Sequence, residues 1–319
     1  MLMYRFPGEE VVRKKGRFRE VTSFSEITEG FVVKPFGDLG VFLFQENENE
    51  PDEWFESDRP IATDKETYIQ SASSAMNELQ TGKLQKVVIS RIKSTAFDFT
   101  SVQEVFKRLE EAYPNAFVYL LSSPLLGTWL GASPEILLNR DAKQFFISSL
   151  AGTKKALDVS EWRGKEVHEQ QLVTEYITSL LGEMQVTNFQ VKGPKDLIAG
   201  PVKHLFTEFT GETILSSAHM LDKLHPTPAV AGLPKKEALD FIREHEQHNR
   251  DLYAGIIGYY SQEVTSLYVN LRCAQLFRNQ AFLYLGGGLT AQSNVEEEWQ
   301  ETENKAKTLE KIFQLTSFT

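Results

Sequence analysis

The spacing of hydrophobic and polar positions predicts short strands that follow one another as hairpins, with helices between groups of strands. Strands are expected where β-branched and aromatic residues run between turn residues, and helices where apolar residues recur every three or four positions. The expected strands are a hairpin over residues 31–44 that turns at 37–40, and residues 86–90, 117–123, 128–132, 136–139, 144–149, 187–191, 254–260, 266–275 and 281–285. The expected helices are residues 67–79, 102–112, 161–184, 234–245 and 296–313.

This order of elements favours an α+β fold with largely antiparallel sheets. It lacks the regular alternation of strand and helix that is typical of a parallel sheet. The acidic, apolar-poor segment 45–60 is the one candidate linker, but strand-like and helix-like patterns resume directly around it. We interpret it as an exposed loop and expect a single domain over residues 1–319.

Composition excludes some classes of partner. The chain has 319 residues, of which 41% are hydrophobic, so a large core is expected. Its 34 Lys and Arg against 44 Asp and Glu give a formal net charge of −10, and no block of basic residues stands out. Nucleic acid and membranes are therefore not expected as partners. An anionic substrate would have to be held by local cations.

Cysteine usage and the absence of long apolar segments favour a cytoplasmic protein. Cys273 is the only cysteine, so a disulfide within the chain is excluded. The first 20 residues contain no apolar run of the kind that a signal peptide needs. The uncharged stretch 113–134 is interrupted by serine, proline and glycine at 122–127, so a hairpin explains it better than a membrane span.

Two glutamates, Glu169 and Glu301, lie on helix faces that also carry apolar residues. Glu169 shares the apolar face of its expected helix with Leu172 and Val173, so it must be paired with a lysine, protonated or bound to a metal. Glu301 and Lys305 form an i,i+4 pair, which is most simply a surface ion pair. The apolar residues that follow Lys305 on the same face also allow this pair to point inward.

Other residues are informative only in combination. Lys86 begins a β-branched run and is either a strand-end lysine or a buried base. Arg272, inside an apolar run, needs an anion, which is either a structural partner or a ligand. Three glycines at 286–288 form a tight bend or admit a ligand close to the backbone. Glu135 follows a turn and His225 ends a short helix, so an exposed carboxylate and a helix cap are the simplest interpretations.

Eight segments together resemble the chorismate-utilising enzyme family, which includes isochorismate, salicylate, anthranilate and aminodeoxychorismate synthases. They occur in the family's order over residues 86–305. The matching segments are KVVISR (86–91), GASPE (131–135), SLAGT (149–153), HEQQLV (168–173), HPTPAVAGLP (225–234), NLRCA (270–274), LGGGL (285–289) and EWQETENK (298–305).

The resemblance implies a fold with two packed antiparallel sheets and helices outside them, and a Mg²⁺-dependent site. Glu169 and Glu301 match the family's metal ligands, and a metal between them would let an acidic protein bind the dianion chorismate. The positions that match the substrate pocket are Gly152, Thr153, His225, Ala229, Val230, Arg272, Gly286 and Lys305. Among these, Arg272 and Lys305 match positions that contact substrate carboxylates.

Within the family, the residues favour isochorismate synthase. That reaction adds water at ring C2 and expels the C4 hydroxyl, so it needs a base and an acid. Lys86 matches the lysine that activates water, and Glu135 matches the general acid. Anthranilate synthases usually carry Gln where Lys86 stands, and one large group of aminodeoxychorismate synthases carries a nucleophilic Lys where Ala151 stands. The HPTPAV wording also resembles the isochorismate branch.

Alternatives remain open at this level. A salicylate synthase shares the same catalytic pair and then eliminates pyruvate. An ammonia-dependent synthase subunit would need a glutaminase partner. A non-catalytic chorismate-binding protein would form no product. We expect a monomer that needs no glutaminase subunit, acting in menaquinone or siderophore biosynthesis. Two departures from the family pattern are the short region before Lys86 and the pair Lys154-Lys155, where many relatives have proline and arginine.

Overall fold

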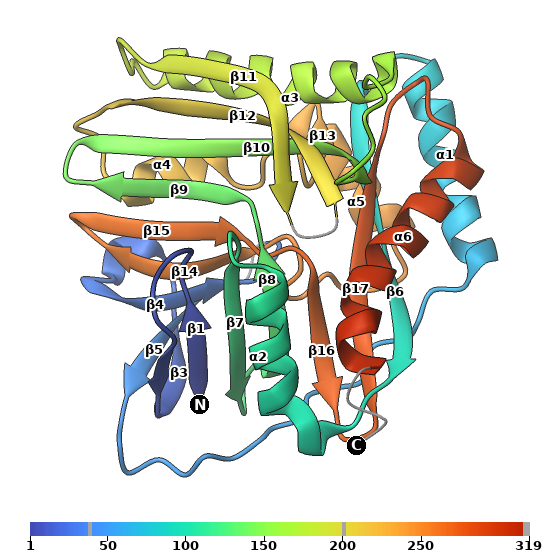
Figure 1. Cartoon of the computed structure of the whole chain (residues 1–319). Coiled ribbons are helices and arrows are strands. Elements are labelled where there is room, and N and C mark those ends of the chain that lie inside the picture. The colour runs from blue at the N-terminus through green and yellow to red at the C-terminus, as the bar shows by residue number, and fades with distance from the viewer. Residues whose placement is uncertain (38–39, 200–201, 315–319) are drawn as a thin grey trace.

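The computed structural model describes residues 1–37, 40–199 and 202–314, and these residues form two β-sheets with helices outside them (Figure 1). Strands β9, β10, β12 and β15 run across the view of Figure 1, whereas β6, β7, β16 and β17 run from top to bottom. Every strand pairing that the structure describes is antiparallel. The expected α+β fold with two antiparallel sheets is confirmed.

Strand order shows how far each sheet departs from simple hairpins. The eight-stranded sheet has the order β13-β6-β17-β16-β8-β7-β1-β2 and the nine-stranded sheet the order β11-β12-β10-β9-β15-β14-β4-β5-β3. The strands of the first sheet are β1 (Leu2–Arg5), β2 (Val12–Lys14), β6 (Lys86–Ala96), β7 (Phe117–Ser123), β8 (Gly127–Ser133), β13 (Gly232–Leu233), β16 (Cys273–Phe277) and β17 (Gln280–Leu289). Those of the second are β3 (Gly16–Val21), β4 (Glu29–Lys34), β5 (Val41–Glu46), β9 (Ile136–Asp141), β10 (Gln144–Lys155), β11 (Gln190–Ala199), β12 (Val202–Glu212), β14 (Ile256–Ser261) and β15 (Val264–Val269).

The helices cover the outer faces and carry two of the expected site carboxylates. They are α1 (Lys65–Gln80), α2 (Val102–Ala112), α3 (Gly164–Glu183), α4 (Ser217–Leu224), α5 (Lys235–His245) and α6 (Val295–Gln314), with short 3₁₀ turns η1 (Phe24–Glu26) and η2 (Phe99–Ser101). Helix α3 packs on β10 and β12, and α6 packs on β17. The N-terminal halves of the two helices carry Glu169 and Glu301, which line the same cavity.

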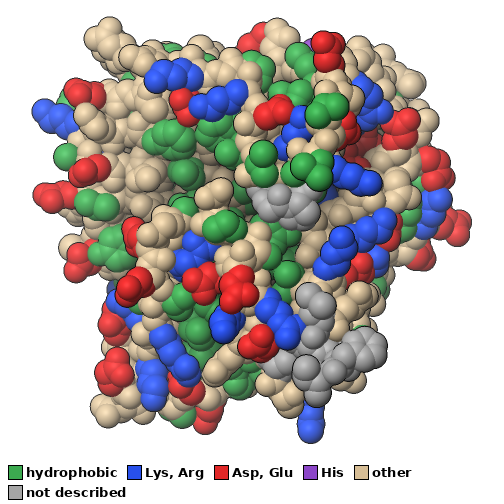
Figure 2. Space-filling model, in the orientation of Figure 1, with side chains coloured by type: hydrophobic (Ala, Val, Ile, Leu, Met, Phe, Trp, Pro, Cys, Tyr) green, Lys and Arg blue, Asp and Glu red, His purple; other side chains and the backbone are tan. Residues whose placement is uncertain are grey.

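The largest core cluster lies between the two sheets. It includes Phe117 and Trp129 from the eight-stranded sheet and Ile147, Phe209 and Leu267 from the nine-stranded sheet, all almost fully buried. Smaller clusters lie under α2 and α6, and under α1 and α5. On the face shown in Figure 2, acidic and basic side chains are interspersed. None of the described helices is long and apolar enough to span a membrane.

The strand expected over residues 266–275 is wrong, because the chain changes sheet within it. The structure divides this run into β15 and β16, which belong to different sheets. Arg272, between them, has a positive φ of 47°, which a continuous strand cannot contain. Alternating apolar residues continue on both sides of the break, so the pattern alone gives no sign of it.

Other differences concern strands that the sequence did not indicate. Strands β1, β2, β3, β12 and the two-residue β13 were missed, and β11 begins at Gln190 and extends well beyond the expected end at 191. Proline, glycine and lysines in β11 obscure the alternation that marks a strand. The hairpin at 31–44 is present as β4 and β5, although part of its expected turn, residues 38–39, lies outside the described residues. The loop after β5 and the β7–β8 hairpin agree with expectation.

A buried ion pair joins α5, β6 and the loop before β13. The guanidinium of Arg250 donates to the carbonyls of Val88 and Val230, each at 2.7 Å, and to the carboxylate of Glu246 at 2.6 and 2.8 Å. Both side chains of the pair are 2% exposed. Removing one partner of such a pair leaves a buried charge without compensation.

We therefore expect Arg250→Ala to lower the free energy of unfolding by about 3–5 kcal/mol. Lys236→Ala removes a lysine that is 87% exposed and should change stability by less than about 0.5 kcal/mol. Urea denaturation of both variants measures the difference. Equal stability of the two variants would contradict the structural role of Arg250.

Candidate active site

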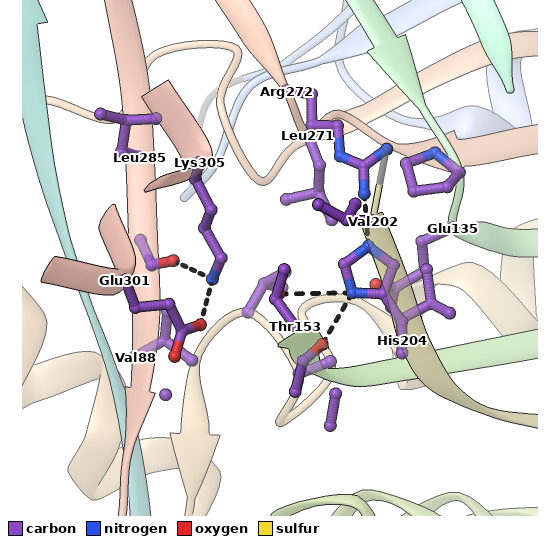
Figure 3. Close-up of a pocket in the computed structure, with 18 of the residues that line it drawn as sticks. Val88, Glu135, Thr153, Val202, His204, Leu271, Arg272, Leu285, Glu301 and Lys305 are labelled. Atoms are coloured by element: carbon purple, nitrogen blue, oxygen red, sulfur yellow. Dashed lines mark hydrogen bonds and ion pairs between the residues drawn. The ribbon is translucent and has the colours of Figure 1, made fainter. Parts of the chain in front are cut away.

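A cavity of about 140 Å³ lies where the two sheets meet, a volume that accepts a six-membered carbon ring. Its wall is built from both sheets, α3 and α6. Ten of the residues that the sequence analysis singled out line it: Glu135, Gly152, Thr153, Glu169, Ala229, Val230, Arg272, Gly286, Glu301 and Lys305. Figure 3 shows Glu301 and Lys305 on one side of this space and Thr153, His204 and Arg272 on the other.

Two hydrogen-bonded crossovers between the sheets place Glu135 and Arg272. The chain passes from β8 to β9 through Glu135 and from β15 to β16 through Arg272. The amide of Val269 donates to the carbonyl of Glu135 at 3.0 Å, and the amide of Ala132 donates to the carbonyl of Arg272 at 3.2 Å. Each crossover thus fixes the other, and both side chains are held at the junction that the cavity occupies.

Lys86 lies at the start of β6 and is completely buried. Its Nζ is 3.0 Å from Oε1 of Glu169. A Cβ added to Gly288 would overlap that Glu169 oxygen and would lie 3.0 Å from Cε of Lys86. Lys86 is not itself in the cavity wall, but it adjoins the wall through Glu169 and Gly288. Lys86 is therefore not a strand-end lysine with its ammonium in water.

Glu135 is the one buried carboxyl of the cavity wall that has no cation in direct contact among the described residues. Its side chain is buried, and its Oε1 has no hydrogen-bond partner in the described part of the chain. Burial raises the pKa of Glu135 to about 8, while the positive charge of Lys86 acts in the opposite direction. Glu135 is therefore mostly protonated at neutral pH and has a proton to donate.

Arg272 is held by a histidine that the sequence analysis did not single out. Nδ1 of His204 lies 2.7 Å from the carbonyl of Gly152, and Nε2 contacts the Arg272 guanidinium (Figure 3). Burial and the positive charge of Arg272 lower the pKa of His204 to about 3, so the ring is neutral. The neutral ring donates from Nδ1 to Gly152 and accepts at Nε2 from Arg272. Nη1 of Arg272 is buried without a partner among the residues that the structure describes, so it is available to an anion.

Carboxylates from α3 and α6 line the opposite side of the site. Glu301 and Lys305 are 2.8 Å apart and only 28% and 29% exposed, so the pair points inward. The Nζ of Lys305 also donates to the carbonyl of Gly286 at 2.7 Å. Glu169 completes this group from α3, where its burial agrees with its place on the apolar face.

Two further buried carboxylates, Glu166 and Glu298, were missed. Glu166 precedes Glu169 by three residues and pairs with Arg163. Glu298 precedes Glu301 by three residues and pairs with Lys165. Each leaves one carboxylate oxygen buried without a partner within residues 1–37, 40–199 and 202–314. Their i,i+3 spacing from Glu169 and Glu301 puts them on the same helix faces and could have identified them.

These carboxylates fit a hard divalent cation. Among the described residues, no group of three or more His, Cys, Asp or Glu is close enough to form a complete protein cage. Mg²⁺ does not need one, because it usually binds one or two carboxylates and keeps several waters. The unpartnered oxygens of Glu166 and Glu298 and the oxygen-only donor set suit such a hydrated ion.

His225 is the predicted pocket residue that the structure does not bring to this cavity. Its Nε2 lies 2.8 Å from the carbonyl of Ala254, and its ring lines a neighbouring cavity. Burial lowers the pKa of His225 to about 3, so the ring is neutral. The same segment turns back after Thr227, and Ala229 and Val230 reach the cavity instead. His225 thus holds this segment to Ala254 and does not contact the cavity.

Known proteins resemble this chain over most of its length. Isochorismate synthase EntC of Escherichia coli (strain K12) is 32% identical over 279 residues, which cover 81% of this chain and 70% of EntC. The solved structure of MenF, the menaquinone-specific isochorismate synthase from Escherichia coli, matches with a TM-score of 0.82 and 24% identity over 98% of this chain and 88% of that one.

The same fold occurs in a protein with a different name. Anthranilate synthase component I from Streptococcus pneumoniae TIGR4 matches with a TM-score of 0.70 and 19% identity, covering 97% of this chain and 89% of that chain. The fold is therefore shared by an isochorismate synthase and an anthranilate synthase component, and it does not separate the two. A family model described as chorismate binding enzyme matches residues 40–314. With eight ordered motifs and this match, the chain belongs to the chorismate-binding enzyme family.

Proposed function

We propose that this protein is an isochorismate synthase, which converts chorismate to isochorismate by adding water at C2 and expelling the C4 hydroxyl. The observation that carries the proposal is that a buried, mostly protonated Glu135 lies in the cavity wall, while a buried Lys86 adjoins that wall through Glu169 and Gly288. Such a pair supplies the acid and the base that the reaction requires. The similarity to EntC supports the same activity.

In the proposed mechanism, Lys86 accepts a proton from water as its oxygen bonds to C2. The ring double bond shifts, the C4–O bond breaks, and Glu135 gives its proton to the departing oxygen, which leaves as water. The positive charge of Lys86 opposes the effect of burial on the pKa of Glu135. One proton must then return from Lys86 to Glu135 before the next turnover.

Cations of the cavity hold the substrate dianion in this proposal. Arg272 has a free N–H for one carboxylate, and its orientation is set by His204. Lys305 lies on the opposite wall, where Glu301 and the carbonyl of Gly286 fix its ammonium. Gly152, Thr153, Ala229 and Val230 form the remaining contact surface. This arrangement places charged contacts at two ends of a ring.

Glu169 and Glu301 are the proposed ligands of Mg²⁺, with Glu166 and Glu298 nearby for its water shell. A bound Mg²⁺ would supply the positive charge that holds a substrate carboxylate among acidic side chains. The pairing of Glu169 with Lys86 links this group of carboxylates to the proposed base. No glutaminase activity is proposed for this chain, because Cys273 is fully buried and burial raises the pKa of its thiol.

Incubation of the purified protein with chorismate and Mg²⁺, without ammonia, tests the proposal. Chromatography should show isochorismate without pyruvate or salicylate. Salicylate with equimolar pyruvate would assign a salicylate synthase that uses the same catalytic pair. Turnover that appears only on addition of ammonia, or binding without any product, would overturn the proposal.

We expect Lys86→Ala to abolish turnover while the fold persists, because the variant loses the base. The matched control is Lys83→Ala, which removes a lysine that is 70% exposed and lies three residues earlier. Initial rates and circular dichroism of both variants are the measurements. Retained activity in Lys86→Ala would remove the assignment of the base.

The activity should fall as pH rises through about 8, because Glu135 acts in its protonated form and its pKa is raised to about 8. Glu135→Gln should lower kcat by about 100- to 10,000-fold and remove this alkaline decline. The measurement is the pH dependence of kcat between pH 6 and 10. An alkaline decline that persists unchanged in Glu135→Gln would assign it to another group.

Glu169→Gln and Glu301→Gln should weaken Mg²⁺ binding by at least about tenfold, because each removes a charged oxygen ligand. Glu296→Gln, in the exposed first turn of α6, is the control. Titration of activity with Mg²⁺, and calorimetric titration of the metal into the protein, measure the effect. Equal metal titrations for all three variants would exclude Glu169 and Glu301 as ligands.

A further inference from the structure

The connection between β10 and α3, residues 156–163, borders the cavity at both of its ends. It follows Gly152 and Thr153 on β10 and precedes Glu169 on α3, and these three residues line the cavity. The exposed fractions of Leu157 and Val159 within it are 94% and 97%, so apolar packing does not hold this segment in place. Its anchors must therefore be polar or aromatic.

Trp162 is the aromatic anchor of this connection. Its indole Nε1 donates to Oδ1 of Asp196 at 2.7 Å, and Asp196 accepts in turn from Lys203 at 2.6 Å. The ammonium groups of Lys154 and Lys203 lie 4.9 and 5.7 Å from the centroid of the Trp162 ring. Two cations on one indole, together with a hydrogen bond to a carboxylate, fix the ring more firmly than one contact would.

Lys154 also ties the rest of the connection to β10. Its Nζ donates to the hydroxyl of Ser160 at 3.0 Å and to the carbonyl of Glu161 at 2.5 Å. Lys154 is the first residue of the Lys-Lys pair by which this chain departs from the family pattern. One lysine thus holds the backbone of the connection and its tryptophan together.

Trp162 rests directly on the backbone that lines the cavity. A Cβ at Gly152 would come within 2.9 Å of Cζ3 of Trp162, and Gly152 has a φ of +64°, so any larger residue would strain the backbone and displace the ring. The carbonyl of Gly152 accepts from His204, and His204 contacts Arg272. A continuous set of contacts therefore runs from the ring of Trp162 to the guanidinium of Arg272.

We propose that Trp162 is a positioning residue for substrate binding, which presses the Gly152 segment of β10 into the place that orients His204 and Arg272 toward a substrate carboxylate. This inference rests on the proposed function, because it takes a chorismate carboxylate as the group that Arg272 receives. Trp162 touches neither the substrate nor the reacting groups. Its loss lets the connection and the Gly152 carbonyl shift together, and Arg272 then loses its fixed orientation.

The test compares Trp162→Ala with Trp54→Ala, which removes another half-buried tryptophan that packs on Phe99 and does not line the cavity. Calorimetric titration gives the Kd for chorismate, and steady-state kinetics give KM and kcat. For Trp162→Ala we expect Kd and KM to rise by at least about tenfold, with kcat changed by less than about threefold. Trp54→Ala should leave Kd unchanged.

Milder variants separate positioning from general stability. Trp162→Phe keeps a ring for the two lysines but loses the donor to Asp196, so its Kd should lie between those of wild type and Trp162→Ala. Lys154→Met should weaken binding and Lys154→Arg should restore it, because arginine keeps the charge over the ring. Melting temperatures of all variants are measured alongside.

The proposal is overturned if Kd in Trp162→Ala stays within about twofold of wild type, or rises equally in Trp54→Ala. It is also overturned if Kd follows the melting temperature across all variants, which would indicate a purely structural role. A wild-type protein that binds chorismate without forming isochorismate would defeat the proposed function alone, and the Kd comparison would still decide the role of Trp162. Failure of the wild type to bind chorismate would overturn both.

Discussion

The two crossovers between the sheets are the constraint on which the site depends. Glu135 and Arg272 lie where the chain leaves one sheet for the other, and backbone hydrogen bonds from Val269 and Ala132 tie the crossovers together. Asn270 adds a buried amide that accepts from the hydroxyl of Tyr119 at 2.8 Å and donates to the carbonyl of Leu252 at 2.8 Å. Buried backbone N–H and C=O groups that have no partner within a sheet thus form hydrogen bonds with nearby groups of the junction, as buried peptide groups must. These hydrogen bonds hold the backbone of the junction in place, and the side chains of Glu135 and Arg272 line the cavity between the sheets.

Charge balance explains how so many ionisable groups are buried at this junction. Glu169 is compensated by Lys86, and Glu301 by Lys305. Such buried pairs add little net stability, because the cost of removing two ions from water offsets their attraction. Their presence is better explained by binding and chemistry. Glu135 lacks such a contact and stays mostly protonated at neutral pH, so one glutamate of the site has a proton to donate while two others pair with lysines.

Much of this organisation could be predicted from the sequence, and the failures have physical causes. Helical periodicity placed Glu169 on a buried face, because α3 packs one side on the neighbouring strands β10 and β12 of a single sheet. Periodicity failed at 266–275, since alternating residues remain apolar while the strand changes sheet. His204 was missed because β12 was missed, and β12 is buried along much of its length without clear alternation. His225 matched a family motif, yet its ring bonds the carbonyl of Ala254 and lies outside the cavity.

The glycine run in β17 has a consequence for how this strand tolerates sequence change. Successive residues of a strand face opposite sides, so Gly286 and Gly288 face the cavity and Gly287 faces away from it. An added methyl at 288 would overlap the Glu169 carboxylate and at 286 the Tyr253 hydroxyl, whereas at 287 it would meet nothing closer than 3.4 Å. Natural variation should therefore be unequal among three identical neighbours: alanine is admissible at 287, while 286 and 288 are restricted to glycine. Part of the cavity volume exists because Gly286 and Gly288 have no side chains, and a larger residue at either position would fill it.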